Sequence, residues 1–254
     1  MNKLIKSLGL SLSLTFLSAV SAKAATYKVV PGDSLYTIGK VFNTSSTALM
    51  ESNNLSSSAI YPGEAVNVPA TQYTVKKGDT LYLIAKNFDI SLYILRAANN
   101  YWTDSIYANQ VLLIPSTSTS LNSTNKVTSS VVPYTESDLD LLARLINAEA
   151  QGEPYKAKVA VGAVVINRVQ SSSWPNTISD VIYQKVNGYY QFTPVLNGWI
   201  NNAATAESRQ AALDALKGID PTNGAEFYFD DSTKNTWLWS KTVALRVDKM
   251  VFSY

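Results

Sequence analysis

An internal repeat covers most of the N-terminal half of this 254-residue chain and limits what that half can fold into. Residues 27–69 align with residues 73–115 at a constant offset of 46 positions, without a gap. The matched pairs include Gly32-Asp33 with Gly78-Asp79, Asn53-Asn54 with Asn99-Asn100, and Pro69 with Pro115. A repeat of this length marks one supersecondary unit used twice. The alignment therefore predicts two similar small modules in succession.

The order of elements expected in each module is β-α-α-β. In the first module a β-like segment (residues 27–30) precedes a Pro-Gly turn, and Asp33 or Ser34 can cap the helix that follows. Leu35, Ile38 and Phe42 recur at helical spacing and predict its buried face. A second helix over 46–53 and a closing strand over 65–68, after a Tyr-Pro-Gly turn, complete the unit.

The spaced combination of Gly-Asp-Ser/Thr-Leu, Asn-Asn and a closing strand that ends in Pro resembles the LysM module over residues 26–69 and 72–115. The resemblance implies binding of N-acetylglucosamine-containing polymers, peptidoglycan or chitin. The groove would lie between the loop after the first strand and the loop before the last. Alternatively, the Asp, Ser and Thr side chains only cap helices and the tyrosines only pack, and both roles are compatible. The implied glycan-binding residues are Asp33, Ser34, Asn54, Ile60, Tyr61, Asp79, Thr80, Asn100, Ile106 and Tyr107.

The first 24 residues have the pattern of a signal peptide. Lys3 and Lys6 form a positive start, an apolar run covers 8–20, and Ala22-Lys23-Ala24 is an A-x-A cleavage site. The run is shorter than the roughly 20 apolar residues that a membrane helix needs. We therefore expect a secreted chain that begins at Ala25 and has no membrane association after cleavage. The alternative is an uncleaved membrane anchor.

Charge and residue usage exclude several classes of function. Loss of the three lysines in residues 1–24 lowers the formal net charge from +2 to −1, which does not favour nucleic acid or anionic lipid as partners. The chain has no Cys and no His. Thiolate nucleophiles, Ser-His-Asp triads and the usual zinc sites are therefore excluded, and we expect neither metal nor cofactor. Asp and Glu remain, which are the residues that glycosidic chemistry uses.

A change in composition after Pro115 predicts a linker. Residues 116–133 are rich in Ser, Thr and Asn and lack apolar periodicity, as flexible exported linkers do. We expect this segment to separate the repeats from a third domain over 134–254. The alternative is a loop that folds onto either neighbour.

The third domain is predicted to be an α+β domain that is mostly helical. Thr135 with Asp138 fits a capping box, and Leu139, Leu142 and Ile146 define the inward face of the helix that follows. Further helices are expected over 155–169, 177–183 and 205–218. Aromatic segments at 226–229 and 237–239 predict short strands.

Glu149 lies beside the apolar face of that first helix. Loss of solvent raises the pKa of a carboxyl group toward the range of a general acid at neutral pH. Glu153, four residues on, can reach the same side and raise one of the two pKa values further. Alternatively, Glu149 is solvated and Glu153 pairs with Lys156 or Lys158. Arg168, near the end of the second helix, also suits the helix dipole as a simple cap.

Several segments of this domain together resemble the cell wall hydrolase family of the spore cortex-lytic enzymes. They are residues 147–154 (NAEAQGEP), 159–168 (VAVGAVVINR), 174–182 (WPNTISDVI), Gln191-Phe192 and 227–229 (FYF). The resemblance implies a lysozyme-like α+β fold and cleavage of glycan strands between N-acetylmuramic acid and N-acetylglucosamine, generally as a lytic transglycosylase. The family's catalytic Glu falls on Glu149. We expect Glu153, Asn167, Arg168, Gln191 and Phe192 to line or support the site.

One segment departs from the family. Members commonly carry a His in a Gly-x-His-x-Phe-like segment near the C-terminus, where this chain has Asp248 at the Gly position and Met250 at the His position. Two alternative functions stay open: an amidase that cuts between glycan and stem peptide, against which the absence of His and Cys argues, and a non-catalytic peptidoglycan-binding protein. The leading expectation is a monomeric enzyme in the cell wall or spore cortex.

Overall fold

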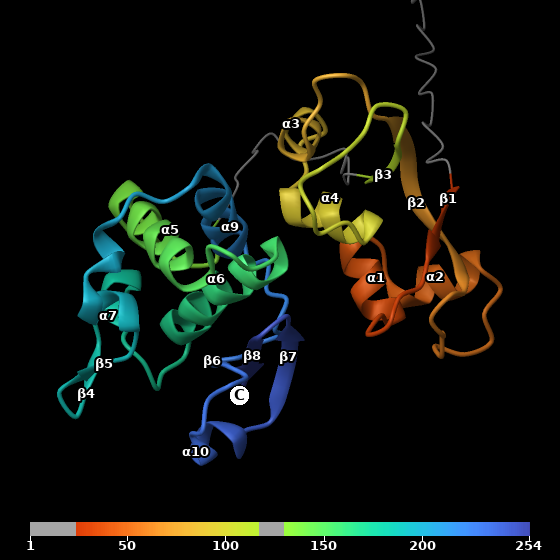
Figure 1. Ribbon diagram of the computed structural model, residues 1–254. Coiled ribbons are helices and arrows are strands. Elements are labelled where there is room, and N and C mark those ends of the chain that lie inside the picture. Colours follow the sequence, from red (N-terminus) through yellow and green to blue (C-terminus); the bar gives the residue numbers. More distant parts are fainter. Residues whose placement is uncertain (1–23, 117–129) are drawn as a thin grey trace, which may run out of the picture.

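The computed structural model describes residues 24–116 and 130–254 (Figure 1). The predicted signal peptide, except for Ala24, and most of the predicted linker lie outside the described residues. Within the described ranges, no helix combines the length and apolarity needed to cross a membrane.

The two repeats have the predicted β-α-α-β order but share one strand. The strand β2 pairs antiparallel with β1 through residues 65–69 and with β3 through residues 70–74. The predicted closing strand of the first module and opening strand of the second are therefore one continuous strand. The elements are β1 (Ala24–Lys28), α1 (Leu35–Val41), α2 (Ser46–Ser52), β2 (Ala65–Thr74), α3 (Leu81–Asn87), α4 (Leu92–Asn99) and β3 (Val111–Pro115).

Local capping explains where the first helix of each repeat begins. The Ser34 side chain accepts from the Thr37 N–H at 3.1 Å, and Thr80 does the same for Leu83 at 3.1 Å. Each bond satisfies one N–H that the first helical turn leaves without a partner. The predicted apolar face is buried, and its Phe42 packs edge-on against Tyr27 at 5.4 Å.

The third domain is mostly helical, as predicted, with two small antiparallel sheets among the described residues. One is the pair β4-β5, and the other has the strand order β6-β8-β7. The Thr135–Asp138 capping box is present and begins the first helix of the domain. The elements are α5 (Glu136–Ala150), α6 (Tyr155–Gln170), α7 (Ile178–Ile182), β4 (Lys185–Val186), β5 (Tyr189–Tyr190), α8 (Thr193–Asn197), η1 (Trp199–Asn201), α9 (Ala206–Leu216), β6 (Phe227–Asp230), α10 (Thr236–Trp239), β7 (Val243–Val247) and β8 (Met250–Ser253).

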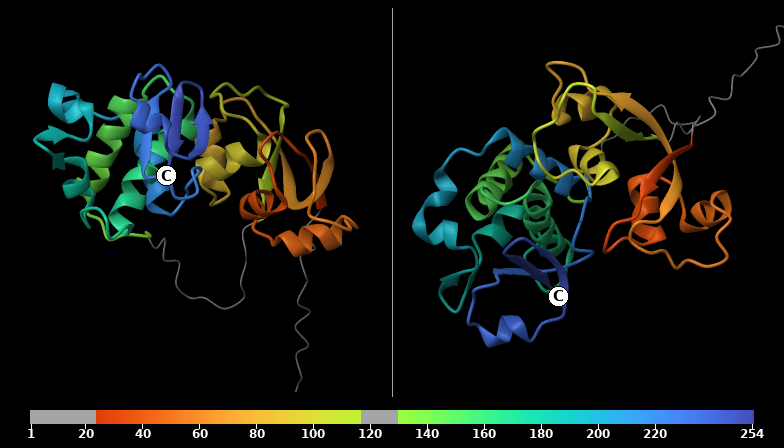
Figure 2. Two further views of the ribbon diagram at one scale, coloured as in Figure 1. Left: turned by 90° about the horizontal axis from the view of Figure 1, so that it is seen from below. Right: turned by 45° about the vertical axis from the view of Figure 1, so that its right-hand side comes forward.

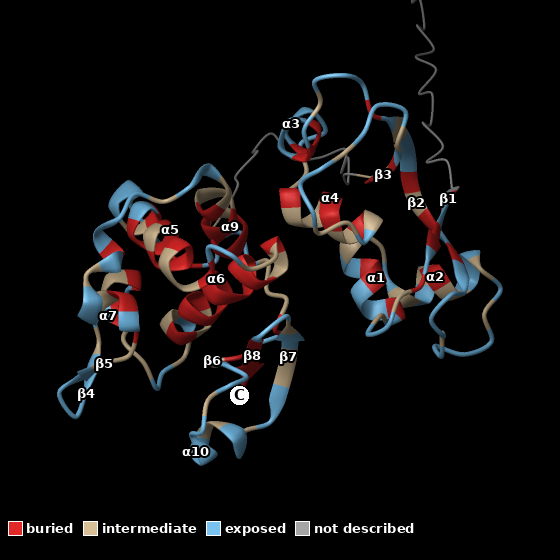
Figure 3. Cartoon of the chain, in the orientation of Figure 1, coloured by how far each residue is buried: buried red, intermediate tan, exposed pale blue. Residues whose placement is uncertain are grey.

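The core of this domain lies among α5, α6 and α9, where buried residues gather on the facing sides of the helices (Figure 3). Gly162 in α6 permits this close approach. A Cβ atom there would lie 2.9 Å from the Cβ of Ala215 and 3.0 Å from the Cδ1 of Ile146. The strongly apolar second helix is therefore buried, as expected, because helices enclose it on two sides.

The predicted strand at Trp237–Trp239 is wrong, because these residues form the helical turn α10. Asn235 accepts at Oδ1 from the N–H groups of Trp237 and Leu238, at 3.0 and 3.4 Å. Such a side chain cap favours a helical turn. The aromatic alternation alone did not reveal it.

The second repeat and the third domain are in contact. Helix α4 of the repeat lies beside α6 and α9 of the third domain (Figures 1 and 2). One hydrophobic cluster contains buried residues of both. The last residues of the predicted linker pack on the third domain, since Val131 donates its N–H to the Leu216 carbonyl at 2.9 Å and Val132 is buried.

Candidate active site

A cavity of about 290 Å³ brings together Glu149 and most of the residues predicted to line or support its site. Its walls come from the end of α5, the segment between β5 and α8, and the strands β6 and β8. Four of its lining residues, Thr193, Tyr228, Phe229 and Asp230, were not among the predicted site residues. The full lining is Glu149, Glu153, Arg168, Gln191, Phe192, Thr193, Tyr228, Phe229, Asp230 and Met250.

Glu149 lies in the last turn of α5, where the helix reaches the cavity. Burial raises the pKa of its carboxyl group from 4.5 to about 7. Loss of solvent destabilises the charged form, and little positive charge compensates for it. At neutral pH the group is therefore present in comparable amounts as acid and as carboxylate, which is the state that a general acid/base requires.

Tyr228 of β6 is the residue that opposes this effect. Its hydroxyl is buried, and its interaction with the Glu149 carboxylate lowers the Glu149 pKa, although less than burial raises it. The two groups do not meet full hydrogen-bond geometry, and among the described residues no other partner binds that hydroxyl. The buried hydroxyl is thus placed to interact with the Glu149 carboxyl group. The aromatic segment 226–229 predicted the strand but not this role.

Glu153 lies in the turn between α5 and α6 and lines the same cavity. Burial, followed by the nearby charge of Asp248, raises the pKa of its carboxyl group. Its Oε2 atom is buried without a partner in the structure. Lys158 does not pair with that carboxylate, because its Nζ donates to the Glu153 backbone carbonyl at 3.0 Å and to Glu207 at 2.7 Å.

Arg168 contributes a buried cation held among aromatic rings. Its guanidinium lies 4.1 Å from the ring centre of Trp174 and 5.2 Å from that of Phe192, and its Nε donates to the Glu226 carbonyl at 2.8 Å. Burial lowers the pKa of Arg168 to about 10, so the group stays charged at neutral pH. Its Nη1 atom has no hydrogen-bond partner in the structure. Arg168 therefore offers a positioned donor in the cavity wall, which is more than the helix cap considered from the sequence.

Asn167 is the one predicted catalytic-domain residue outside the cavity lining. Its side chain donates to Asp220 at 3.1 Å and to the Ala225 carbonyl at 2.9 Å. Ala225 comes two residues before β6, so this contact holds the strand that carries Tyr228. Asn167 thus supports the site instead of facing it.

The hairpin of β7 and β8 brings Met250 into the cavity wall. Asp248, at the turn, has a φ of 49°, in the left-handed region that glycine adopts most easily. Asp248 therefore keeps the backbone conformation that a Gly at this position would adopt. At the position where the family commonly has His, the cavity has a thioether. Among the described residues, no cluster of three or more Asp and Glu side chains is placed to hold a metal ion.

The predicted LysM residues divide into two groups by their contacts. Tyr61 and Tyr107 are strongly exposed, at 64% and 70% of their surface. Asp33 binds within its own turn instead, since its Oδ2 accepts from the Tyr27 hydroxyl and the Val30 N–H, and Asp79 does the same with the residues at the equivalent positions. Ser34 and Thr80 are helix caps, so the two tyrosines are the candidates freest to contact a sugar.

The Asn-Asn pairs have mainly backbone roles. Asn53 exchanges two hydrogen bonds with the backbone of Asn67, at 2.7 and 3.0 Å, and Asn99 does the same with Leu113. The second residue of each pair has positive φ, 53° at Asn54 and 46° at Asn100. Ile60 and Ile106 are partly buried against the hydrophobic clusters. This motif is accounted for by the fold, and its contact with glycan stays a prediction.

Two family profiles match parts of the chain. The LysM domain profile matches residues 27–69 and 73–115, and the Cell Wall Hydrolase profile matches residues 152–253. The protein named cell wall hydrolase CwlJ of Halalkalibacterium halodurans is 32% identical over 102 residues, which are 39% of this chain and 68% of that protein. The chain belongs to the cell wall hydrolase family.

Other relatives of this cell wall hydrolase are longer proteins. The spore cortex-lytic enzymes of H. halodurans and Bacillus cereus are each 38% identical, over 128 and 129 residues. These alignments cover 50% of this chain but only 38% and 48% of the two relatives. The solved catalytic domain of the germination-specific lytic transglycosylase SleB from Bacillus anthracis is 37% identical, covering 48% of this chain and all of that one, with a TM-score of 0.44. The hydrolase profile begins three residues after Glu149, so the role of Glu149 is argued from the cavity.

Proposed function

We propose that this cell wall hydrolase is an exported enzyme that binds peptidoglycan through its LysM domains and cuts the bond between N-acetylmuramic acid and N-acetylglucosamine, as a lytic transglycosylase of the wall or spore cortex. The observation that carries the proposal is Glu149. Its carboxyl group lies in a cavity with a pKa of about 7, and that cavity is otherwise lined by residues of the hydrolase domain.

The first step is protonation of the leaving group. The protonated Glu149 carboxyl donates its proton to the glycosidic oxygen as the bond to the anomeric carbon breaks. Positive charge then develops on the sugar ring, and negative charge nearby stabilises it. Asp230 lines the cavity, and hydrogen bonds from the Ser232 side chain and backbone lower the pKa of Asp230, so it is ionised at neutral pH.

The second step takes its nucleophile from the substrate. The C6 hydroxyl of the muramoyl residue attacks the anomeric carbon and gives its proton back to the Glu149 carboxylate, which leaves a 1,6-anhydro sugar. No water is consumed, so a second carboxylate to activate water is unnecessary. A single titrating acid with a pKa near 7 suffices for both proton transfers.

Hydrolysis is a second candidate, because Glu153 lines the same cavity and offers a second carboxyl group there, with its pKa raised by burial and the charge of Asp248. In that reaction a water activated by Glu153 replaces the C6 hydroxyl. The product would carry an ordinary reducing end.

The test is the mass of the products from purified peptidoglycan. Transglycosylation yields anhydromuropeptides that are one water lighter than hydrolytic fragments, whereas reducing ends would reject this reaction in favour of hydrolysis. Glu149→Gln should abolish product formation while Glu153→Gln retains it. Full activity of Glu149→Gln would refute the assignment of the acid, and release of free stem peptides would indicate an amidase.

A further inference from the structure

The second LysM domain contacts the catalytic domain through α4, and a buried carboxylate lies at the centre of this contact. Asp214 of α9 has no exposed surface. It accepts from the Tyr93 N–H at 3.0 Å, from the Tyr155 hydroxyl at 2.9 Å and from Gln210 at 3.1 Å. Its partners therefore come from both domains, and both of its oxygens are bound.

The bond to Tyr93 has a specific physical meaning. Tyr93 is the second residue of α4, and the first N–H groups of a helix have no partner within the helix. A carboxylate at that end also complements the positive end of the helix dipole. The catalytic domain thus supplies part of the N-terminal cap of a LysM helix.

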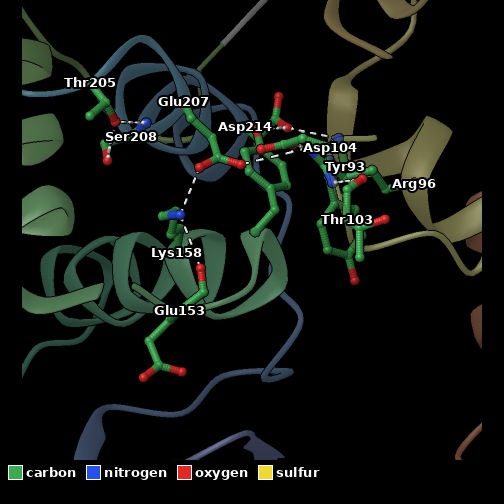
Figure 4. Close-up of polar contacts among 11 residues, drawn as sticks. Tyr93, Arg96, Thr103, Asp104, Glu153, Lys158, Thr205, Glu207, Ser208 and Asp214 are labelled. Carbon is green, nitrogen blue, oxygen red and sulfur yellow. Dashed lines mark hydrogen bonds and ion pairs between the residues drawn. The ribbon is translucent and has the colours of Figure 1, made fainter. Parts of the chain in front are cut away.

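Arg96 of α4 adds a second buried contact, with 2% of its surface exposed. Its guanidinium lies 3.6 Å from Glu207 of the catalytic domain (Figure 4). It also lies 5.0 Å from the ring centre of Tyr155 in that domain. Within its own domain it binds the Thr103 carbonyl and Asp104. A buried charge that loses its partners is strongly destabilising, so these groups favour the docked arrangement.

The network continues from the interface to the edge of the catalytic cavity. Glu207 also binds Lys158 at 2.7 Å, and Lys158 binds the Glu153 carbonyl at 3.0 Å. In Figure 4 the Glu153 carboxylate points away from this network. The backbone of a cavity residue is therefore tied, through two side chains, to the docked LysM helix.

The internal repeat shows that these contacts are particular to the second copy. At the offset of 46, the first copy has Ser46, Thr47 and Met50 where the second has Leu92, Tyr93 and Arg96. The core residue between them is unchanged, Leu49 in one and Leu95 in the other, and both are buried. The LysM fold therefore does not require the interface residues.

We propose that the second LysM domain is a dedicated positioning module, locked to the catalytic domain through Asp214 and Arg96, whereas the first has Thr47 and Met50 at the positions of Tyr93 and Arg96. The locked pair holds a bound glycan strand in one orientation relative to the cavity. A fixed geometry avoids the entropy cost that a freely tethered domain incurs when its bound strand enters the catalytic cavity. This consequence for cutting rests on the proposed function, whereas the docking itself does not.

The structural test exchanges the three residues for those of the first repeat, Leu92→Ser with Tyr93→Thr and Arg96→Met. The matched control exchanges two exposed positions in the same way, Leu83→Thr with Val111→Ala. The exchange should increase the radius of gyration in small-angle scattering and speed hydrogen exchange of the residue-93 amide at least tenfold, with no change in the control. Wild-type protein whose Tyr93 amide is unprotected from hydrogen exchange would overturn the proposal without any variant having to fold.

The functional test separates positioning from catalysis. On glycan fragments too short to reach a LysM domain, the exchanged variant should keep its kcat and KM. On long peptidoglycan strands its kcat/KM should fall several-fold, mainly through KM. Equal kinetics of wild type and variant on long strands would reject the positioning role. Wild-type protein inactive on both substrates would instead reject the proposed function and leave the scattering and exchange results standing.

Discussion

The raised pKa of Glu149 has a consequence for stability that can be measured apart from activity. In the folded protein, burial raises this pKa from 4.5 to about 7. At about 1.4 kcal/mol per pKa unit, the ionised side chain destabilises the folded state by about 3 kcal/mol relative to the unfolded chain. The change Glu149→Gln keeps the shape of the side chain and removes the charge.

The sign of the effect follows from proton binding. Between pH 4.5 and 7 the folded protein binds more protons at this site than the unfolded chain, so the free energy of unfolding falls as the pH rises. The Gln variant cannot ionise at this position, so its free energy of unfolding lacks this pH-dependent contribution. We therefore expect Glu149→Gln and wild type to be similar at pH 4, and the inactive variant to be more stable by about 3 kcal/mol at pH 8.

The assay is urea unfolding followed by tryptophan fluorescence at several pH values. Four of the five tryptophans, Trp174, Trp199, Trp237 and Trp239, lie in the catalytic domain. The control is Glu136→Gln, in the same helix, which removes an exposed ion pair with Arg209 and should change stability by at most about 1 kcal/mol. A difference between Glu149→Gln and wild type that does not change with pH would refute the reasoning, because a buried and destabilised carboxylate requires the pH dependence.

Three further outcomes are expected. Tyr228→Phe removes the group that lowers the Glu149 pKa, so the loss of kcat/KM on the alkaline side should move to higher pH; an unchanged pH profile would count against the contact. Arg168→Lys loses the planar contact with Trp174 and the bond to the Glu226 carbonyl, and thermal unfolding should show a loss of about 1–3 kcal/mol. Gly162→Ala should lower the free energy of unfolding by about 1–2 kcal/mol, seen as a lower denaturation midpoint, because the added Cβ would meet that of Ala215. This loss is expected although Ala favours helix more than Gly does. A more stable variant would show that the helices can separate.

Much of the local structure was predictable because its causes are local. The repeat offset, the caps at Ser34, Thr80 and Thr135, and the apolar face of α5 depend on residues within a few positions of one another. Where a second local signal competed, the prediction failed: the Asn235 cap makes α10 a helix despite its alternating aromatic residues. The position of Glu149 beside a buried helix face followed from the same local spacing, whereas its predicted catalytic role came from the family resemblance.

By itself, then, the sequence determined two LysM-like repeats, a mostly helical domain, a chain without Cys or His, and one carboxyl group placed for burial. Only the tertiary structure decided that Tyr228 meets Glu149, that Asn167 supports β6, and that Asp214 caps a LysM helix. Tyr93 and Asp214 are 121 positions apart, and no periodicity connects residues at that separation. The substitutions at Leu92, Tyr93 and Arg96 were visible in the repeat, but their reason is the surface of α9 and α6, which exists only once the chain has folded.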